Sequence, residues 1–88
     1  MQSYIYPARV TQIARDDFVV RFRDVPEAIT GGPDRDAALA QAPDALACAI
    51  EGYLKLGRQI PSPSAALAGE HPVALEPAIA AMASTPTS

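Results

Sequence analysis

Four acidic side chains in the first third of the chain are the best candidates for metal chemistry. They are Asp16, Asp17, Asp24 and Glu27. Carboxylates that converge on strand ends can hold the divalent ions of a two-metal nuclease. All four instead fall in short polar segments between predicted strands, where aspartate commonly serves as a turn residue. We therefore interpret them as solvated turn residues and expect no metal site.

The other reactive residue types lack partners at useful spacing. His71 is the only histidine, and no cysteine, aspartate or second histidine lies at the sequence spacing of metal ligands. The single Cys48 lies on the apolar side of a predicted helix and lacks the basic setting that activates a thiol, so we expect it to pack in the core. Ser62 and Ser64 have no accompanying His/Asp pattern. The sequence therefore indicates a binding protein rather than an enzyme, and we expect no cofactor.

Length and charge narrow the class of partner. A chain of 88 residues makes one small domain, and association would add useful stability at this size. The formal net charge is −3, which argues against nucleic acid as a generic ligand and favours a basic protein partner. No signal peptide or membrane-spanning stretch is evident. Together with the lone cysteine, this predicts a cytoplasmic protein.

The segment from Asp34 to Leu56 is predicted to be the one long helix. Its apolar residues recur at the three-and-four spacing of a single helix face. Asp34 is the expected N-cap, and Gly57 is placed to end the helix. Pro43 lies inside this segment, at a cost of about 3 kcal/mol. Because the apolar face keeps its phase on both sides, we expect one helix, bent near Pro43.

Alternating apolar and polar residues predict strands before and after this helix. The first runs over residues 3–13, the second over 18–22 and the third over 28–30, with turns at 15–17 and 23–27. Pro7 is expected at a bulge or where one side of its strand is unpaired. Gly31-Gly32-Pro33 reads as a break before the helix. Residues 71–75 are a predicted edge strand, and residues 76–83 have weak helical character.

The predicted core combines the inward faces of these elements. Its members are Tyr6, Val10, Phe18, Val20, Phe22, Leu39, Leu46, Ile50 and Leu54. The sheet face away from the helix carries a second set, composed of Ile5, Arg9, Val19, Arg21 and Arg23. This is more apolar area than a small sheet usually leaves in water. We therefore predict a homo-oligomer, most simply a dimer, that buries this face.

Five pieces of the sequence, taken in order, resemble the HicB-type antitoxins of HicA/HicB toxin–antitoxin pairs. They are Tyr6-Pro7-Ala8; the run Phe18, Val20, Phe22, Asp24, Val25 and Pro26; Thr30 with Gly32; the helix residues Ala38, Ala42, Ala45 and Leu46; and the exit Gly57, Ile60, Pro61, Pro63 and Ser64. The resemblance covers about residues 4–75. Arg23 stands where the pattern has proline, and Glu27 stands where it has glycine.

The resemblance implies a fold class and a role. The fold is a small α+β, partial RNase H-like arrangement, β-β-β-α-β, with three antiparallel strands, a short fourth strand and one long covering helix. Residues 1–75 would form the HicB-like domain, and 76–88 a short helical or frayed tail. Because no helix-turn-helix or ribbon-helix-helix module is matched, we expect no operator binding.

The implied function is neutralisation of a small, basic, HicA-like mRNA-cleaving toxin by direct contact. Asp16, Asp17, Asp24 and Glu27 are the candidate contact residues, because an RNA-binding toxin presents a basic face. The alternative is an orphan or truncated relative that only self-associates. A neighbouring gene for a small basic protein would distinguish the two.

Overall fold

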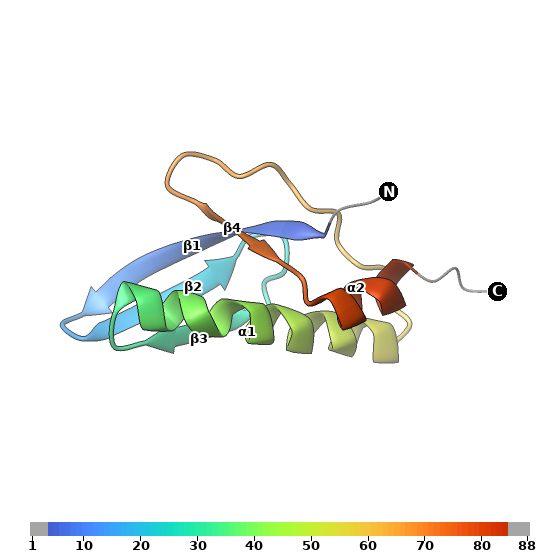
Figure 1. Ribbon diagram of the computed structural model, residues 1–88, viewed down its shortest axis with the longest axis horizontal. Helices are drawn as coiled ribbons and strands as arrows, with labels where there is room; N and C mark the ends of the chain where they lie inside the picture. Colours follow the sequence, from blue (N-terminus) through green and yellow to red (C-terminus); the bar gives the residue numbers. More distant parts are fainter. Residues whose placement is uncertain (1–3, 85–88) are drawn as a thin grey trace.

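The computed structural model describes residues 4–84 and contains one four-stranded antiparallel sheet. The strands are β1 (Ile5–Ala14), β2 (Asp17–Phe22), β3 (Ile29–Gly32) and β4 (His71–Ala74), in the order β3-β2-β1-β4. The long helix α1 (Arg35–Lys55) lies along the sheet, and the short helix α2 (Pro77–Ser84) follows β4 (Figure 1). The predicted α+β class and element order are confirmed. No helix among the described residues is long and apolar enough to cross a membrane.

The longest pairing in the sheet is the β1–β2 hairpin. Its tip is a two-residue turn in which Asp16 adopts a φ of 61°, a left-handed conformation that aspartate tolerates better than most residues. The register shifts between Gln12 and Ala14, so the strands bulge just before the tip. The hairpin therefore projects the turn, with Asp16, at one end of the molecule (Figure 1).

Helix α1 begins and ends as its sequence predicts. Asp34 accepts a hydrogen bond from the Ala37 N–H at 2.8 Å, which is the N-cap interaction. At the other end Gly57 has a φ of 67°, and the N–H of Arg58 donates to the Tyr53 carbonyl at 2.9 Å, as in a Schellman motif. The helix continues through Pro43, whose side chain is exposed. The prediction of one helix that does not end at Pro43 is confirmed, and the bend near Pro43 stays a prediction.

Two prolines face each other across the β1–β4 pair. Pro7 is opposite Pro72 in the register, and the Leu75 N–H donates to the Tyr4 carbonyl at 2.8 Å. Opposite residues in an antiparallel ladder alternate between hydrogen-bonded and non-hydrogen-bonded pairs, so the two prolines occupy a non-hydrogen-bonded position. On its other side β1 pairs with β2 only from Ala8 onward. Neither proline therefore removes a ladder bond, as we predicted for Pro7.

Strand β3 differs from its prediction, because the two glycines belong to the strand rather than to a break. A Cβ at Gly31 would lie 2.6 Å from the Phe18 carbonyl oxygen, and one at Gly32 would lie 2.7 Å from the Ala38 nitrogen. These contacts show that β3 packs too closely against β2 and α1 to accept side chains at either position. The glycines therefore allow tight packing, not a change of direction.

The core lies between α1 and the inward sheet face. Of the nine predicted core residues, Tyr6, Val20, Phe22, Leu46 and Ile50 are fully enclosed, and the other four pack partly buried against them. The prediction missed several buried residues at turns, near the end of α1 and in the last third of the chain: Val25, Ala28, Tyr53, Val73, Leu75 and Ile79.

Cys48 corrects another expectation, because it is exposed rather than packed in the core. It stands two residues from both Leu46 and Ile50, which are fully buried. Two residues correspond to about 200° of helical rotation, so Cys48 points to the opposite side of α1.

Candidate partner-binding surfaces

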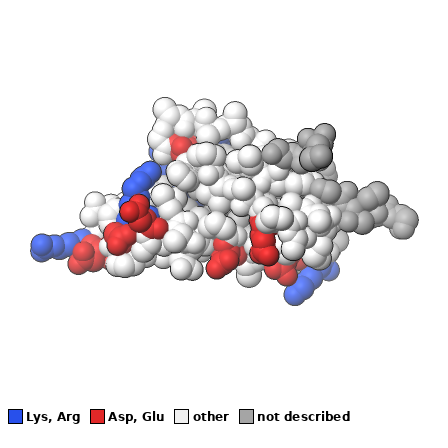
Figure 2. Space-filling view, in the orientation of Figure 1, with Lys and Arg blue, Asp and Glu red and all other residues white. Residues whose placement is uncertain are grey.

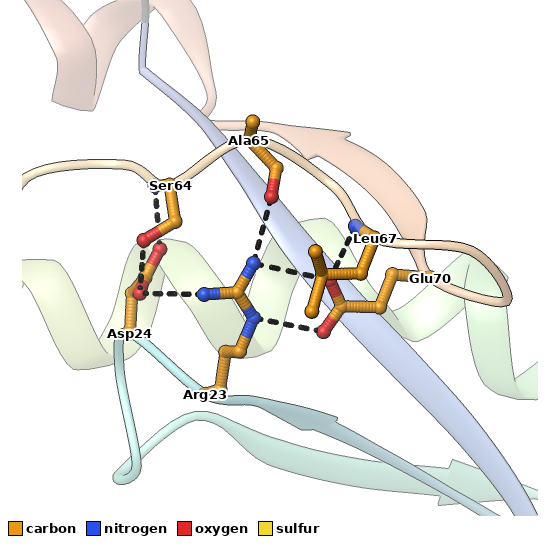
Figure 3. Close-up of polar contacts among 6 residues, drawn as sticks. All are labelled: Arg23, Asp24, Ser64, Ala65, Leu67 and Glu70. Atoms are coloured by element: carbon orange, nitrogen blue, oxygen red, sulfur yellow. Dashed lines mark hydrogen bonds and ion pairs between the residues drawn. The ribbon is translucent and has the colours of Figure 1, made fainter.

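A polar cluster ties the turn after β2 to the proline-rich segment between α1 and β4 (Figure 3). The carboxylate of Asp24 accepts two hydrogen bonds from Ser64, from the N–H at 2.7 Å and the hydroxyl at 2.8 Å. The neighbouring Arg23 donates to both oxygens of Glu70, at 2.9 and 3.2 Å, and to the Ala65 carbonyl at 2.7 Å. The segment is thus fixed although it contains no helix or strand.

Glu70 is the carboxylate that joins Arg23 to the loop in this cluster. It binds Arg23 in the two-pronged geometry that suits guanidinium and carboxylate, and it also accepts the Leu67 N–H at 2.8 Å. The hydrogen bonds from Arg23 are the largest cause that lowers the pKa of Glu70, and the Leu67 N–H adds to it. The same pairing raises the pKa of Arg23. Glu70 is therefore committed to holding its own loop.

Glu27 makes a second tie, from the same turn to the end of α1. It accepts a hydrogen bond from the Tyr53 hydroxyl at 2.7 Å and lies 3.5 Å from the Arg58 guanidinium. Arg58 also stacks over the Tyr53 ring at 4.4 Å from its centroid. The Tyr53 hydrogen bond is the main cause that lowers the pKa of Glu27, and the same bond raises the pKa of Tyr53.

Tyr6 anchors the start of the proline-rich segment from inside the core. Its ring is fully buried, and its hydroxyl donates to the Pro61 carbonyl at 2.8 Å. Burial is the main cause that raises the pKa of Tyr6 to about 12, with smaller contributions from Tyr4 and Asp24. Tyr6 therefore remains a neutral hydrogen-bond donor over the physiological range.

The four predicted partner-contact carboxylates do not form one patch. Asp16 and Asp17 are exposed at the hairpin tip, whereas Asp24 and Glu27 lie beyond the other end of β2. A strand of this length separates the two pairs by roughly 17–20 Å. Both oxygens of Asp24 accept a hydrogen bond from Ser64, on the segment between α1 and β4. Figure 2 shows acidic and basic side chains interspersed on the face drawn, with no single acidic surface.

Four of the five predicted self-association residues lie on one sheet face, away from α1, whereas Arg23 follows the end of β2. Ile5 is 44% exposed, Arg9 and Arg21 are exposed, and Val19 is half-buried. Arg9 and Arg21 sit directly opposite each other in the β1–β2 register. A pocket of about 370 Å³ opens beside them, lined by Arg9, Arg21, Phe22, Arg23, Pro26, Leu67 and Glu70. Sequence reasoning missed this pocket, because Leu67 and Glu70 come from a loop of no regular structure.

Within the described residues no three His, Cys, Asp or Glu side chains gather in a way that could hold a metal ion. The polar clusters are instead pairs of donors and acceptors that satisfy one another. In residues 4–82, every buried side-chain nitrogen and oxygen has a hydrogen-bond partner.

Comparison with known proteins agrees with this picture. The family model of the HicB-like antitoxins of bacterial toxin–antitoxin systems matches residues 5–83. The chain belongs to the HicB-like antitoxin family. Antitoxin HicB 2 of Photorhabdus laumondii is 51% identical over 47 residues, which is 53% of this chain and 34% of that protein. Antitoxin HicB of Escherichia coli is 35% identical over 66 residues, or 75% of this chain and 48% of that protein.

Antitoxin HicB 1 of Photorhabdus laumondii is a further relative, 40% identical over 58 residues, which cover 66% of this chain and 37% of that protein. The chain thus spans about a third to a half of the length of the curated relatives it matches. The match to the family model begins at β1 and extends into α2.

Two residues that depart from the HicB-like pattern make specific contacts in the structure. Arg23 stands in place of a proline, and it binds Glu70 and the Ala65 carbonyl. Glu27 stands in place of a glycine, and it binds Tyr53 and Arg58. Both departures therefore add links from the β2–β3 turn, one to the end of α1 and one to the segment between α1 and β4.

Proposed function

We propose that this protein is an antitoxin that neutralises a small, basic, HicA-like mRNA-cleaving toxin by direct contact, with no nuclease activity of its own. The observation that carries the proposal is the match of the HicB-like family model to residues 5–83. The ordered motifs from Tyr6 to Ser64 support it, because the structure uses them for strand pairing, the entry to α1 and the polar cluster. We place this activity in the cytoplasm, where such a toxin would meet its mRNA substrate.

The charge of the chain supports a protein partner rather than DNA or RNA. At a net charge of −3, a polyanion would be repelled on average, whereas a basic toxin would be attracted. Exposed charges of this kind mainly speed encounter and set orientation, and the apolar centre of a contact holds the complex. Direct binding to an operator is not part of the proposal.

The carboxylates at the hairpin tip are the better candidates for steering the toxin. Asp24 and Glu27 each serve an intramolecular contact, so their replacement would loosen the fold and confuse a binding measurement. Asp16 is exposed at the tip of the β1–β2 turn. Asparagine also tolerates the positive φ of this position, so Asp16→Asn removes the charge alone.

The decisive experiment co-expresses this chain with the small basic protein encoded beside it. A complex in pull-down, and RNA cleavage that falls in proportion to added antitoxin, are the expected results. Association measured by stopped flow should slow in Asp16→Asn and lose part of its salt dependence. Asp44→Asn on α1 removes the same charge from an exposed helix position and serves as the control. If both variants associate at the wild-type rate, hairpin steering is wrong.

A second candidate is a HicB-like relative that only self-associates. The observation that favours it is the sheet face with Ile5, Val19 and two opposed arginines, which does not depend on a toxin. Absence of any complex with the neighbouring gene product, together with a stable homo-oligomer, would select this candidate and defeat the antitoxin assignment.

A further inference from the structure

The outer face of the sheet, which points away from α1, carries a patterned row of side chains on β2. Its residues of even number, Phe18, Val20 and Phe22, point toward the core. Successive side chains of a strand alternate between faces, so Asp17, Val19 and Arg21 share the outer face. An acidic, an apolar and a basic residue therefore follow one another at two-residue spacing, with Val19 in the middle.

At the basic end of this row, arginines outnumber the carboxylates that lie near them. Arg21 faces Arg9 across the β1–β2 pair, and like charges directly opposite each other are destabilising. Three arginines and one glutamate line the pocket beside them, so the formal charge of its lining is +2. Glu70 is bound to Arg23 by two hydrogen bonds, so this carboxylate is already used. The positive charges of Arg9 and Arg21 therefore exceed the negative charge that the pocket lining supplies.

The order acidic, apolar, basic along β2 is complementary to the same row of a second copy that runs in the opposite direction. Two outer faces that meet around a two-fold axis at Val19 bring Val19 against its counterpart. Asp17 of each copy then lies opposite Arg21 of the other, because both residues are two positions, about 7 Å, from the centre. Gly31 pairs beside Val19 on β3 and carries no side chain, which leaves the centre of the face low enough for close approach.

We propose that this face is a two-fold interface between two copies of the chain, in which the Asp17 carboxylate of each copy enters the arginine-lined pocket of the other. Such an interface is self-complementary, as two-fold contacts must be. It would also cover Ile29, which lies next to Arg21 in the register and is 51% exposed. Arg23 takes no part, since it is held by Glu70. Asp16 remains outside the interface and is free for the steering role.

A second copy is favoured over nucleic acid as the occupant. A phosphate backbone would bring many negative charges against a chain that is itself negative, and the pocket rim already holds Glu70. A single carboxylate flanked by apolar atoms suits the lining better, because Pro26 and Leu67 lie beside the arginines. The proposal concerns the chain alone and does not rest on toxin binding.

The test is a charge swap followed by mass measurement. The dissociation constant of the purified chain is measured by sedimentation across a micromolar concentration series. Arg21→Asp and Asp17→Arg each place like charges together, so each should weaken the dimer by about tenfold or more. The double variant Asp17→Arg/Arg21→Asp restores opposite charges in exchanged positions and should recover most of the lost affinity. Asp44→Arg, on the exposed side of α1, makes the same charge change as Asp17→Arg and should leave the dissociation constant unchanged.

Circular dichroism and thermal unfolding establish that each variant keeps the fold. Recovery in the double variant excludes a simple folding defect, because it carries both substitutions. A monomeric wild-type chain would overturn the proposal. So would single variants that stay dimeric, or a double variant that stays as weak as the singles. Sensitivity of the dimer to Asp44→Arg would also count against it, since the effect would then come from net charge.

Discussion

Asp24 and Ser64 are 40 residues apart in the sequence, yet the carboxylate of one accepts both the N–H and the hydroxyl of the other, at 2.7 and 2.8 Å. This pair fixes the proline-rich segment against the turn after β2. In this chain it joins a motif that precedes the long helix to a motif that follows it.

Removal of this contact should weaken the fold measurably. Hydrogen bonds to a charged group contribute about 1.5–3 kcal/mol, so Asp24→Ala should lower the free energy of unfolding by about 2 kcal/mol, measured by urea denaturation. Ser64→Ala keeps the N–H bond and should cost about 1 kcal/mol. The double variant should cost less than the sum, because both changes break the same interaction. Strict additivity would show that the pair does not act as a unit.

Acid should selectively weaken the contact between Glu70 and Arg23. The folded state lowers the pKa of Glu70 from its ordinary value of 4.5, chiefly through the Arg23 hydrogen bonds. A lowered pKa adds stability that is present above pH 4.5 and is lost as the pH falls through the folded value. At neutral pH the midpoint of thermal unfolding should therefore be higher for wild type than for Glu70→Gln. The difference between the two midpoints should shrink below pH 4.5. A gap between wild type and Glu70→Gln that stays constant with pH would refute the linkage.

The two glycines of β3 should tolerate no side chain. Gly31→Ala places a methyl group 2.6 Å from the Phe18 carbonyl oxygen, so backbone must move. Overpacking of this kind costs about 1–3 kcal/mol, and we expect a loss near the upper end by urea denaturation. Gly52→Ala is the matched control, because nothing lies within 4 Å of a Cβ there. It should stabilise α1 by about 0.5–1 kcal/mol. Equal effects at the two sites would contradict the close packing of β3.

Pro43 should be a net cost to α1. The helix runs through it without interruption, and its ring removes one intrahelical hydrogen bond. We expect Pro43→Ala to raise the free energy of unfolding by about 2 kcal/mol, after allowance for the greater freedom of the unfolded chain. Thermal and urea unfolding measure this gain. The buried residues on either side, Ala42 and Leu46, are unchanged by the substitution. A destabilised variant would show that Pro43 makes a contribution beyond its exposed position.

The local elements could be predicted from the sequence because their signals are local. The spacing of apolar residues from Leu39 to Leu54 sets the inward face of α1, and Asp34 and Gly57 mark its ends by short-range hydrogen bonds. The alternation on β1 and β2 likewise sets which side chains face the helix. The ordered motifs also identify the HicB-like family, which the family model matches over residues 5–83. These features depend on neighbours within a few positions.

Only the tertiary structure determined which distant segments contact each other. Nothing near Asp24 in the sequence indicates Ser64, and nothing near Arg23 indicates Glu70, because both partners lie in an irregular loop whose path depends on the packed sheet. The fate of Gly31 depended on the distance between β3 and β2. The four carboxylates assigned to one surface are separated because a strand carries its two end turns apart. Sequence order placed them together, whereas the extended geometry of β2 placed them at opposite ends.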